Sequence, residues 1–157
     1  MTKTMKSILT GMTLAFSLGL APVLLSAPAF AVDNMSSTDA PDLTSVRAKI
    51  KAKDYAAALT ELRDLAEDIQ QADVYNLLGF TLRKTGDVKT SLTYYTKALE
   101  LQPDHKAARE YLGELYVETG NMEKAREQLA VLAKLCPGGC EERDDLQKAI
   151  SAKSASN

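Results

Sequence analysis

The feature that most constrains the fold of this chain is an internal repeat with a period of 34 residues. The recurring pairs are Leu78-Gly79 with Leu112-Gly113, Thr85-Gly86 with Thr119-Gly120, Leu101 with Leu135, and Pro103 with Pro137. A period of roughly 20 to 50 residues is typical of chains built from copies of one small supersecondary unit. Each copy contacts only its neighbours, and the copies together bury a continuous core. The repeat therefore predicts a stack of similar units.

Each repeat predicts a pair of helices. In residues 72–105, Tyr75, Leu78 and Leu82 recur at helical spacing and give the first helix one apolar face. Gly86 then favours the end of that helix, because glycine adopts the left-handed conformation of a helix C-terminus without a steric penalty. The next helix presents four apolar residues on one face, namely Leu92, Tyr95, Ala98 and Leu99.

Short polar residues and prolines mark where the second helices begin and end. Asp87 follows the turn glycine of one repeat and Asn121 follows that of the next, and each is a good side-chain cap. Pro103 ends the helix that Asp87 begins. Gly79 and Gly113 lie inside the first helices, where a glycine costs about 1 kcal/mol relative to alanine. We therefore expect each of these glycines to allow close approach of the paired helix.

These positions resemble the tetratricopeptide repeat family, whose pattern runs aromatic, Leu-Gly, aromatic, turn Gly, small, aromatic, Ala and Pro. In residues 72–105 the pattern falls on Tyr75, Leu78, Gly79, Leu82, Gly86, Ser91, Tyr95, Ala98 and Pro103. In residues 106–139 it falls on Arg109, Leu112, Gly113, Tyr116, Gly120, Ala125, Leu129, Leu132 and Pro137. Arg109 and Leu132 depart mildly from the pattern. The resemblance implies an all-α fold, an α-solenoid of antiparallel helix pairs.

The repeat domain is expected to cover residues 43–152. Residues 43–71 read as a degenerate first unit in which Asp54 is a cap and Lys53 replaces the turn glycine, and the register of its first helix is not fixed by the sequence. Units at 72–105 and 106–139 follow, then a capping helix at 140–152 with Leu146 and Ile150 on one face. Terminal units are expected to be degenerate because one of their faces is exposed to solvent and must be more polar. Residues 153–157 are expected to be a disordered tail.

The first 31 residues have the pattern of a cleaved signal peptide. Lys3 and Lys6 precede an uncharged run from Ile8 to Leu25, and Ala29-Phe30-Ala31 fits the small-x-small cleavage site. An uncleaved membrane anchor is the alternative, since the run approaches the length that spans a bilayer. With cleavage, residues 32–42 become a flexible tail, the remaining chain has no membrane segment, and the protein is periplasmic.

Composition and charge argue against several function classes. The chain has 21 acidic and 19 basic residues and a formal net charge of −2, without a basic cluster, so it is a poor candidate for binding nucleic acid. No nucleophile triad, phosphate loop or zinc pattern is present in the sequence. His105 is the one histidine, and we expect an exposed turn residue beside a capping Asp104. The sequence predicts no enzyme, no cofactor and no metal site.

The resemblance implies a concave face that binds an extended peptide or a partner helix. Positions 5, 9 and 12 of each first helix usually line that face, and here they are Asn76, Phe80, Arg83, Glu110, Glu114 and Val117. Family members that clamp a C-terminal carboxylate use other positions, which here hold Leu77, Ala107 and Tyr111, so that clamp is absent. The two carboxylates suggest a partner with a basic or mixed segment beside an apolar residue. Ordinary solvated helix faces are the alternative.

Cys136 and Cys140 are the two cysteines of the chain, and they flank Pro137-Gly138-Gly139. In an exported protein we favour a disulfide that holds the capping helix on the stack, because the glycines permit a tight bend. Redox or Cu(I) chemistry at this pair is the alternative. The chain also resembles small exported bacterial repeat proteins that end in C-x-x-x-C-E-E and have no established activity. The leading hypothesis is a non-catalytic scaffold in envelope or secreted-protein assembly, and a self-associating structural unit is a third possibility.

Overall fold

The computed structural model describes residues 40–156. The expected signal peptide of residues 1–31 and most of the expected tail at residues 32–42 therefore lie outside the described residues. Within residues 40–156 the chain forms seven helices and no strand. They are α1 (Thr44–Lys51), α2 (Tyr55–Asp68), α3 (Ala72–Lys84), α4 (Val88–Leu101), α5 (Lys106–Glu118), α6 (Met122–Leu135) and α7 (Glu141–Ala155). The expected all-α fold is confirmed.

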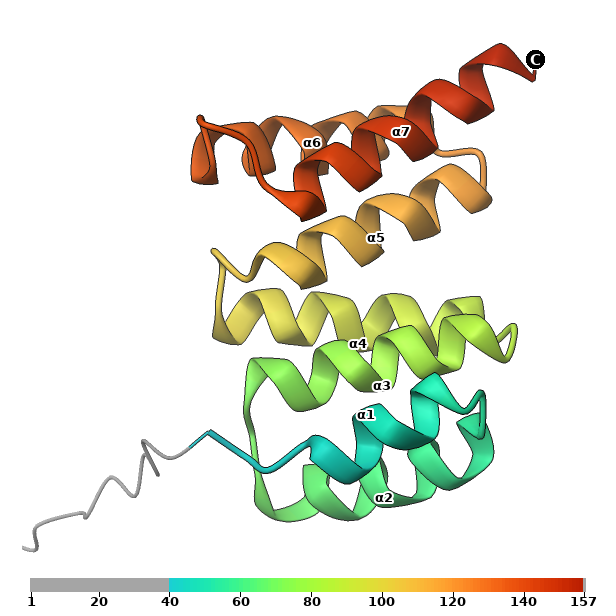
Figure 1. The fold of residues 1–157 in the computed structure, drawn as a ribbon, viewed down its shortest axis with the longest axis vertical. Coiled ribbons are helices and arrows are strands. Elements are labelled where there is room, and N and C mark those ends of the chain that lie inside the picture. The colour runs from blue at the N-terminus through green and yellow to red at the C-terminus, as the bar shows by residue number, and fades with distance from the viewer. Residues whose placement is uncertain (1–39, 157) are drawn as a thin grey trace, which may run out of the picture. The chain divides into compact units, whose positions relative to one another are not determined.

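The helices of residues 40–156 follow one another as antiparallel pairs. Figure 1 shows α1 with α2, α3 with α4 and α5 with α6, with α7 after the last pair. Each pair packs against the next, through α2 with α3 and through α4 with α5. Helix α7 packs against both α5 and α6, which makes it a cap on the final pair.

The helix caps follow the local rules that the sequence indicated. The side chains of Asp54, Asp87 and Asn121 each accept a hydrogen bond from the backbone N–H three residues later, which satisfies one free donor of the first turn. The turn residues Gly86 and Gly120 have positive φ, 90° and 80°. In the degenerate first unit Lys53 takes the same left-handed conformation with φ 61°, a conformation that costs a residue with a Cβ about 1 kcal/mol.

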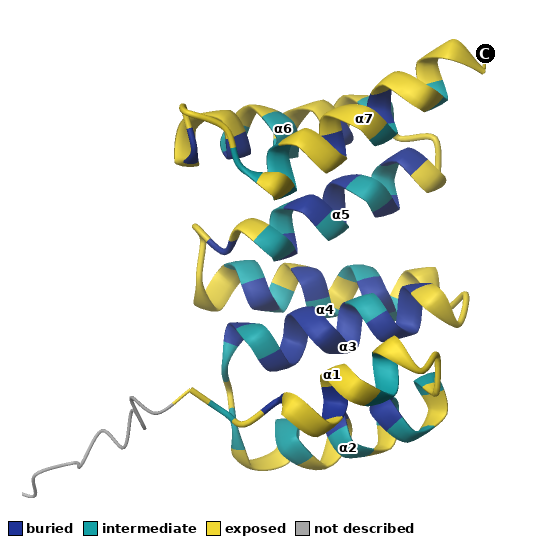
Figure 2. Cartoon of the chain, in the orientation of Figure 1, coloured by how far each residue is buried: buried dark blue, intermediate teal, exposed yellow. Residues whose placement is uncertain are grey.

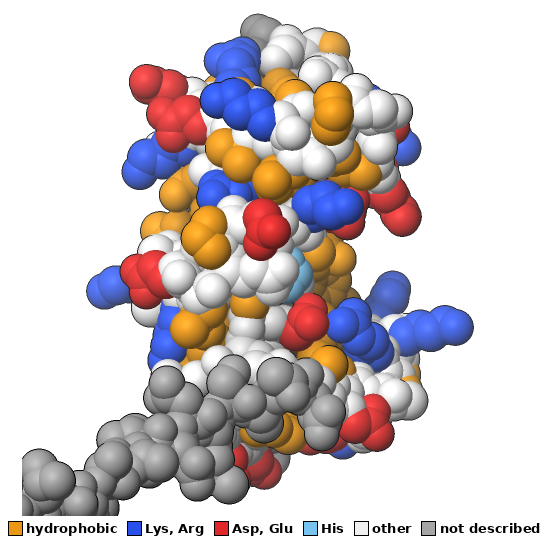
Figure 3. Space-filling view, turned by 90° about the vertical axis from the view of Figure 1, so that its left-hand side faces the viewer, with side chains coloured by type: hydrophobic (Ala, Val, Ile, Leu, Met, Phe, Trp, Pro, Cys, Tyr) orange, Lys and Arg blue, Asp and Glu red, His pale blue; other side chains and the backbone are white. Residues whose placement is uncertain are grey.

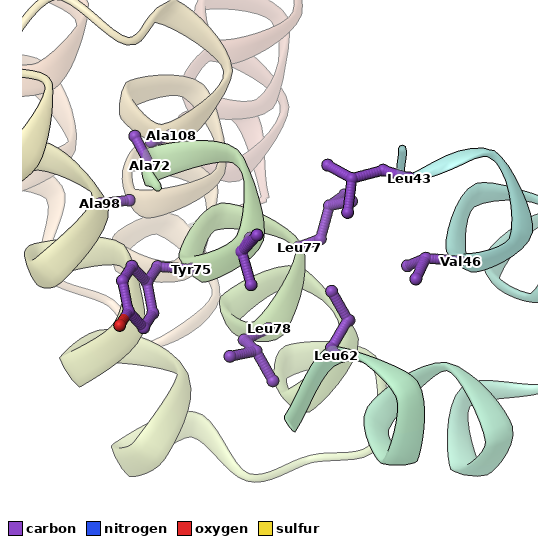
Figure 4. Packing of buried hydrophobic residues seen from close by; sticks show 10 residues of the cluster. Leu43, Val46, Leu62, Ala72, Tyr75, Leu77, Leu78, Ala98 and Ala108 are labelled. Carbon is purple, nitrogen blue, oxygen red and sulfur yellow. The ribbon is translucent and has the colours of Figure 1, made fainter. Parts of the chain in front are cut away.

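Helix α3 is the most deeply buried helix, because it packs against α2, α4 and α5. Figure 2 shows buried residues along most of its length, while most residues in the turns between helices are exposed. Leu78 of α3 is fully buried with Leu62 of α2 and Val46 of α1, and Figure 4 shows these side chains where the three helices meet. A second cluster joins Leu132 of α6 to Leu146 of α7. This burial supplies the stability that short helices lack in isolation.

Both helix glycines lie at close approaches, but they contact different elements. A Cβ on Gly79 would lie 2.7 Å from the ring of Tyr95, so α3 approaches its paired helix α4 as expected. A Cβ on Gly113 would clash with the side chain of Leu146 of α7, so the closest approach there is to the capping helix and not to the paired helix α6. The repeat equivalent of Tyr95 is Leu129, which packs in the same cluster as Leu146 of the capping helix.

The C-terminal helix is longer than expected. Helix α7 continues to Ala155, so residues 153–155 are helical and do not belong to a disordered tail. Its apolar contacts, Leu146 and Ile150, are buried as the spacing predicted. None of the helices within residues 40–156 combines the length and the apolar character needed to cross a bilayer.

Candidate functional site

The six residues that the family resemblance assigned to a groove do not share one exposed surface. Four of them are buried, namely Asn76, Arg83, Glu110 and Val117, with exposed fractions of 3%, 6%, 8% and 7%. Phe80 and Glu114 are half-buried. The structure therefore buries most of the predicted groove residues, and it leaves Phe80 and Glu114 partly open to solvent.

An open hollow of about 230 Å³ lies beside Phe80, where α1, α3 and α5 come together. Its lining residues are Arg47, Ile50 and Lys51 from α1, Leu77 and Phe80 from α3, and Tyr111 from α5. Sequence reasoning selected only Phe80. Leu77 and Tyr111 occupy positions that clamp a carboxylate in other family members, so the repeat register could have indicated that they line the binding face. The three α1 residues were missed because the register of that helix was not fixed by the sequence.

Two aromatic rings shape one side of the hollow. The ring centroids of Phe80 and Tyr111 are 5.0 Å apart with the planes tilted by 51°. Tyr111 also lies 6.4 Å from the ring of buried Tyr95. Such tilted pairs add about 1 kcal/mol beyond the area that they bury. Phe80 and Tyr111 are thus held in place while each stays partly open to solvent.

Arg83 supports this aromatic pair from inside the protein. Its guanidinium carbon lies 5.8 Å from the Phe80 ring centroid and 5.7 Å from that of Tyr111, within reach of a cation–π interaction. Its Nη2 atom donates a hydrogen bond to Oε2 of Glu114 at 2.6 Å, and Nη1 lies 3.5 Å from Oε1 of Glu118. The Arg83 side chain is only 2% exposed. Glu114 is therefore the counter-ion of a buried arginine.

Glu110 is buried where α5 meets α7. Burial raises the pKa of its carboxyl to about 8, with further contributions from Glu114, Asp145 and Glu142, while Arg83 opposes the shift. At neutral pH this side chain is mostly protonated. The burial of Glu110 and the pairing of Glu114 with Arg83 do not favour the hypothesis that these two residues attract a basic partner segment.

The raised pKa predicts a pH dependence of stability. The ordinary pKa of a glutamate is 4.5, so between about pH 4.5 and 8 folded Glu110 holds a proton that the unfolded chain has lost. The stabilising contribution is complete below pH 4.5 and is lost as pH rises through 8. We expect Glu110→Gln to raise the free energy of unfolding by about 1 kcal/mol at pH 7 and to flatten its pH profile. Urea unfolding at pH 5 to 9 measures this, with exposed Glu127→Gln as control. Parallel profiles for wild type and Glu110→Gln would contradict the prediction.

His105 is not the exposed turn residue that the sequence suggested. It is 9% exposed and begins α5, with Nδ1 accepting a hydrogen bond from the N–H of Ala108 at 3.2 Å. Its Nε2 lies 3.2 Å from Oδ1 of Asp73 on α3. His105 therefore caps the helix in place of Asp104 and joins two adjacent repeats.

The structure places the sulfur atoms of Cys136 and Cys140 at disulfide distance, 2.02 Å, with Cα atoms 6.0 Å apart. Cys136 ends α6 and Cys140 immediately precedes α7. Closing a loop this short stabilises the fold by about 2 kcal/mol on the chain-entropy model. Within residues 40–156 no group of three or more His, Cys, Asp or Glu side chains is arranged to hold a metal ion.

A larger hollow of about 600 Å³ lies between α6 and α7. It is lined largely by small and polar side chains, and one of its two arginines, Arg143, is paired with Asp144 at 3.1 Å. No aromatic side chain lines it. The hollow beside Phe80 is smaller, but it combines aromatic rings with cations and is the better candidate for recognition.

Comparison with known proteins agrees with this architecture. Residues 76–139 match the family model described as "Tetratricopeptide repeat". This segment is therefore similar in sequence to tetratricopeptide repeats. Two solved structures share the repeat fold: MamA, with TM-score 0.58 and 18% identity over 72% of this chain and 74% of that one, and YrrB, with TM-score 0.57 and 22% identity over 70% and 57%. YrrB is described as "a TPR protein with an unusual peptide-binding site".

Two curated relatives are similar over the repeat region. Both are described as "Uncharacterized protein ycf37". The protein from Guillardia theta is 34% identical over 73 residues, which are 46% of this chain and 39% of the relative. The protein from Pyropia yezoensis is 32% identical over 71 residues, which are 43% of this chain and 40% of the relative. The match therefore spans about two fifths of each relative's length.

Proposed function

We propose that this protein is a non-catalytic scaffold that binds an extended segment of a partner protein in the hollow between α1, α3 and α5. Stacked tetratricopeptide repeats are in general protein-interaction scaffolds, and residues 76–139 match that family. A described peptide-binding site in YrrB, which shares the fold, supports the same kind of role here.

The observation that carries the proposal is the half-buried aromatic pair at the hollow. Phe80 and Tyr111 are fixed by Arg83 behind them, yet nothing within residues 40–156 fills the space of about 230 Å³ in front of them. That volume is below the range of roughly 300 to 1,000 Å³ typical of small-molecule and cofactor sites. It suits a single large side chain of a bound peptide, and rigid aromatic residues are enriched at the centres of protein interfaces.

We place this function in the periplasm, in the assembly of envelope or secreted proteins. The signal-peptide pattern of residues 1–31 supports export. The cysteine pair at disulfide distance is also typical of oxidising compartments. Cell fractionation with the full-length chain tests the location, and a cytoplasmic, uncleaved protein would contradict it.

Photo-crosslinking tests the binding surface directly. A benzophenone amino acid at position 80 should capture one or a few discrete partners in living cells, because that side chain borders the hollow. The same label at Thr93, which is exposed on α4, is the matched control and should capture none of them. Identical adducts at both positions, or none at either, would contradict the proposal. An adduct with a second copy of this chain would favour the self-assembly hypothesis instead.

A further inference from the structure

The charges that line the hollow beside Phe80 are of one sign. Arg47 and Lys51 project from α1, one helical turn apart, and no carboxylate is among the lining residues. Lys51 is exposed and has no ion-pair partner in the part of the chain that the structure describes. Arg47 lies 3.9 Å from Asp73, with the two side chains 59% and 47% exposed. An exposed pair at that distance is weak and easily replaced.

Three carboxylates near the hollow already have partners inside the protein. Glu114 and Glu118 both face the guanidinium of Arg83, and Asp73 also contacts the ring of His105. A further cation, the Nζ atom of Lys84, lies 5.2 Å from the Phe80 ring centroid. The side of the hollow formed by α1 and α3 is therefore cationic, and the one carboxylate that the described residues pair with its lining cations is Asp73, in a weak exposed contact with Arg47.

This arrangement is local. Figure 3 shows one face of the protein where acidic and basic side chains alternate with hydrophobic ones, without a broad region of one sign. The chain as a whole is weakly acidic, with net charge −2. The two neighbouring positive charges beside the aromatic hollow thus differ from the mixed charges of that face and from the negative net charge of the whole chain.

We infer that the hollow selects a peptide segment in which a carboxylate adjoins a large apolar side chain. This inference rests on the proposed function. The apolar side chain would occupy the hollow and pack against Phe80 and Tyr111, while the carboxylate would lie against Arg47 and Lys51. A charge-assisted hydrogen bond from Arg47 or Lys51 would replace water at the peptide carboxylate. The positive charge of the hollow would also disfavour competing peptides with basic residues. A segment with lysine at the same place would bring like charges together, and discrimination would follow from that repulsion as well.

Selection from a random library of displayed dodecapeptides tests this inference with the full chain. The wild-type protein should enrich peptides with Asp or Glu beside Phe, Leu or Trp. The Lys51→Glu variant should lose the acidic preference by about tenfold in affinity and shift towards Lys or Arg. The Arg47→Glu variant is an independent second test, because Lys51 is the last residue of α1 and its reversal also disturbs the helix terminus. Lys89→Glu, an exposed charge on α4, is the matched control and should select the same peptides as wild type.

The outcomes separate the inference from the proposed function. Enrichment that depends on Phe80 but favours basic or uncharged peptides would overturn the inference and leave the scaffold intact. If no peptide class is enriched over a Phe80→Ala, Tyr111→Ala double variant, the proposed function fails together with the inference. Selected peptides synthesised with free and with amidated C-termini identify the carboxylate. Equal affinity assigns it to a side chain, whereas loss on amidation assigns it to the chain terminus.

Discussion

Glu114→Gln is expected to lower the free energy of unfolding by about 2 kcal/mol, whereas Arg83→Met should cost less. The guanidinium of Arg83 has its closest partner in Glu114, at 2.6 Å, and the Arg83 side chain is 2% exposed. Removing the carboxylate charge leaves a buried cation with only the more distant Glu118 at 3.5 Å. An uncompensated buried charge is strongly destabilising, whereas an apolar replacement of similar length removes the charge itself. Met would also remove the Arg83 atoms Nε and Nη1, which have no hydrogen-bond partner.

Chemical denaturation of the two variants beside Glu118→Gln tests this order. Glu118 is 53% exposed, so its substitution should change the free energy of unfolding by less than about 0.5 kcal/mol. Because Arg83 also holds the rings of Phe80 and Tyr111 in place, Glu114→Gln should weaken peptide binding if it lets those rings move. If Arg83→Met proves the more destabilising variant, the Arg83–Glu114 ion pair contributes net stability and the prediction is contradicted.

Gly79→Ala is expected to lower the free energy of unfolding by about 2 kcal/mol, although alanine is the better helix former. A Cβ at this position would lie 2.7 Å from Cδ1 and Cε1 of Tyr95, whose ring is fully buried. The ring cannot move away freely, because it packs against Leu112 and Leu115 of the next repeat. Overpacking of this kind costs about 1 to 3 kcal/mol or more, which exceeds the gain of about 1 kcal/mol in helix propensity.

Two further variants make this prediction specific. Gly138→Ala should be close to neutral, since nothing lies within 4 Å of the added Cβ. The double variant Gly79→Ala, Tyr95→Leu should recover part of the loss relative to the sum of the single changes, because a smaller side chain leaves room for the methyl group. Additive effects in this cycle would show that the glycine matters for a reason other than contact with Tyr95.

Local rules were sufficient for the helices and their ends. Asp54, Asp87 and Asn121 cap helices because a short side-chain acceptor needs only the N–H groups of its own first turn. The same reasoning failed at His105, where Asp104 looked like the better cap. The histidine ring bonds to Asp73, 32 residues away, and that contact holds it over the N-terminus of α5.

The candidate site was only partly predictable, because its character depends on contacts between repeats. Phe80 could be placed from the repeat register alone. The two glutamates at equivalent positions of the next unit looked like a docking surface for a basic segment. Arg83, 31 residues before Glu114, neutralises one of them, and burial against α7 protonates the other. The cations that remain come from α1, whose register no local signal fixed.

The 34-residue period, the caps and the turn glycines are properties of the sequence by itself, and they determine a stack of antiparallel helix pairs. Their signals are local because each depends on residues within a turn or two of the same helix. Which side chains remain free to meet a partner was decided only by the tertiary structure. A charged side chain can bind a partner only if it is exposed and is not already ion-paired with a residue of another repeat. Both conditions depend on residues about 30 positions away in the sequence. Sequence analysis therefore predicted the stack of helix pairs, and the packing of α3, α5 and α7 decided that Glu110 is buried and that Glu114 is paired with Arg83.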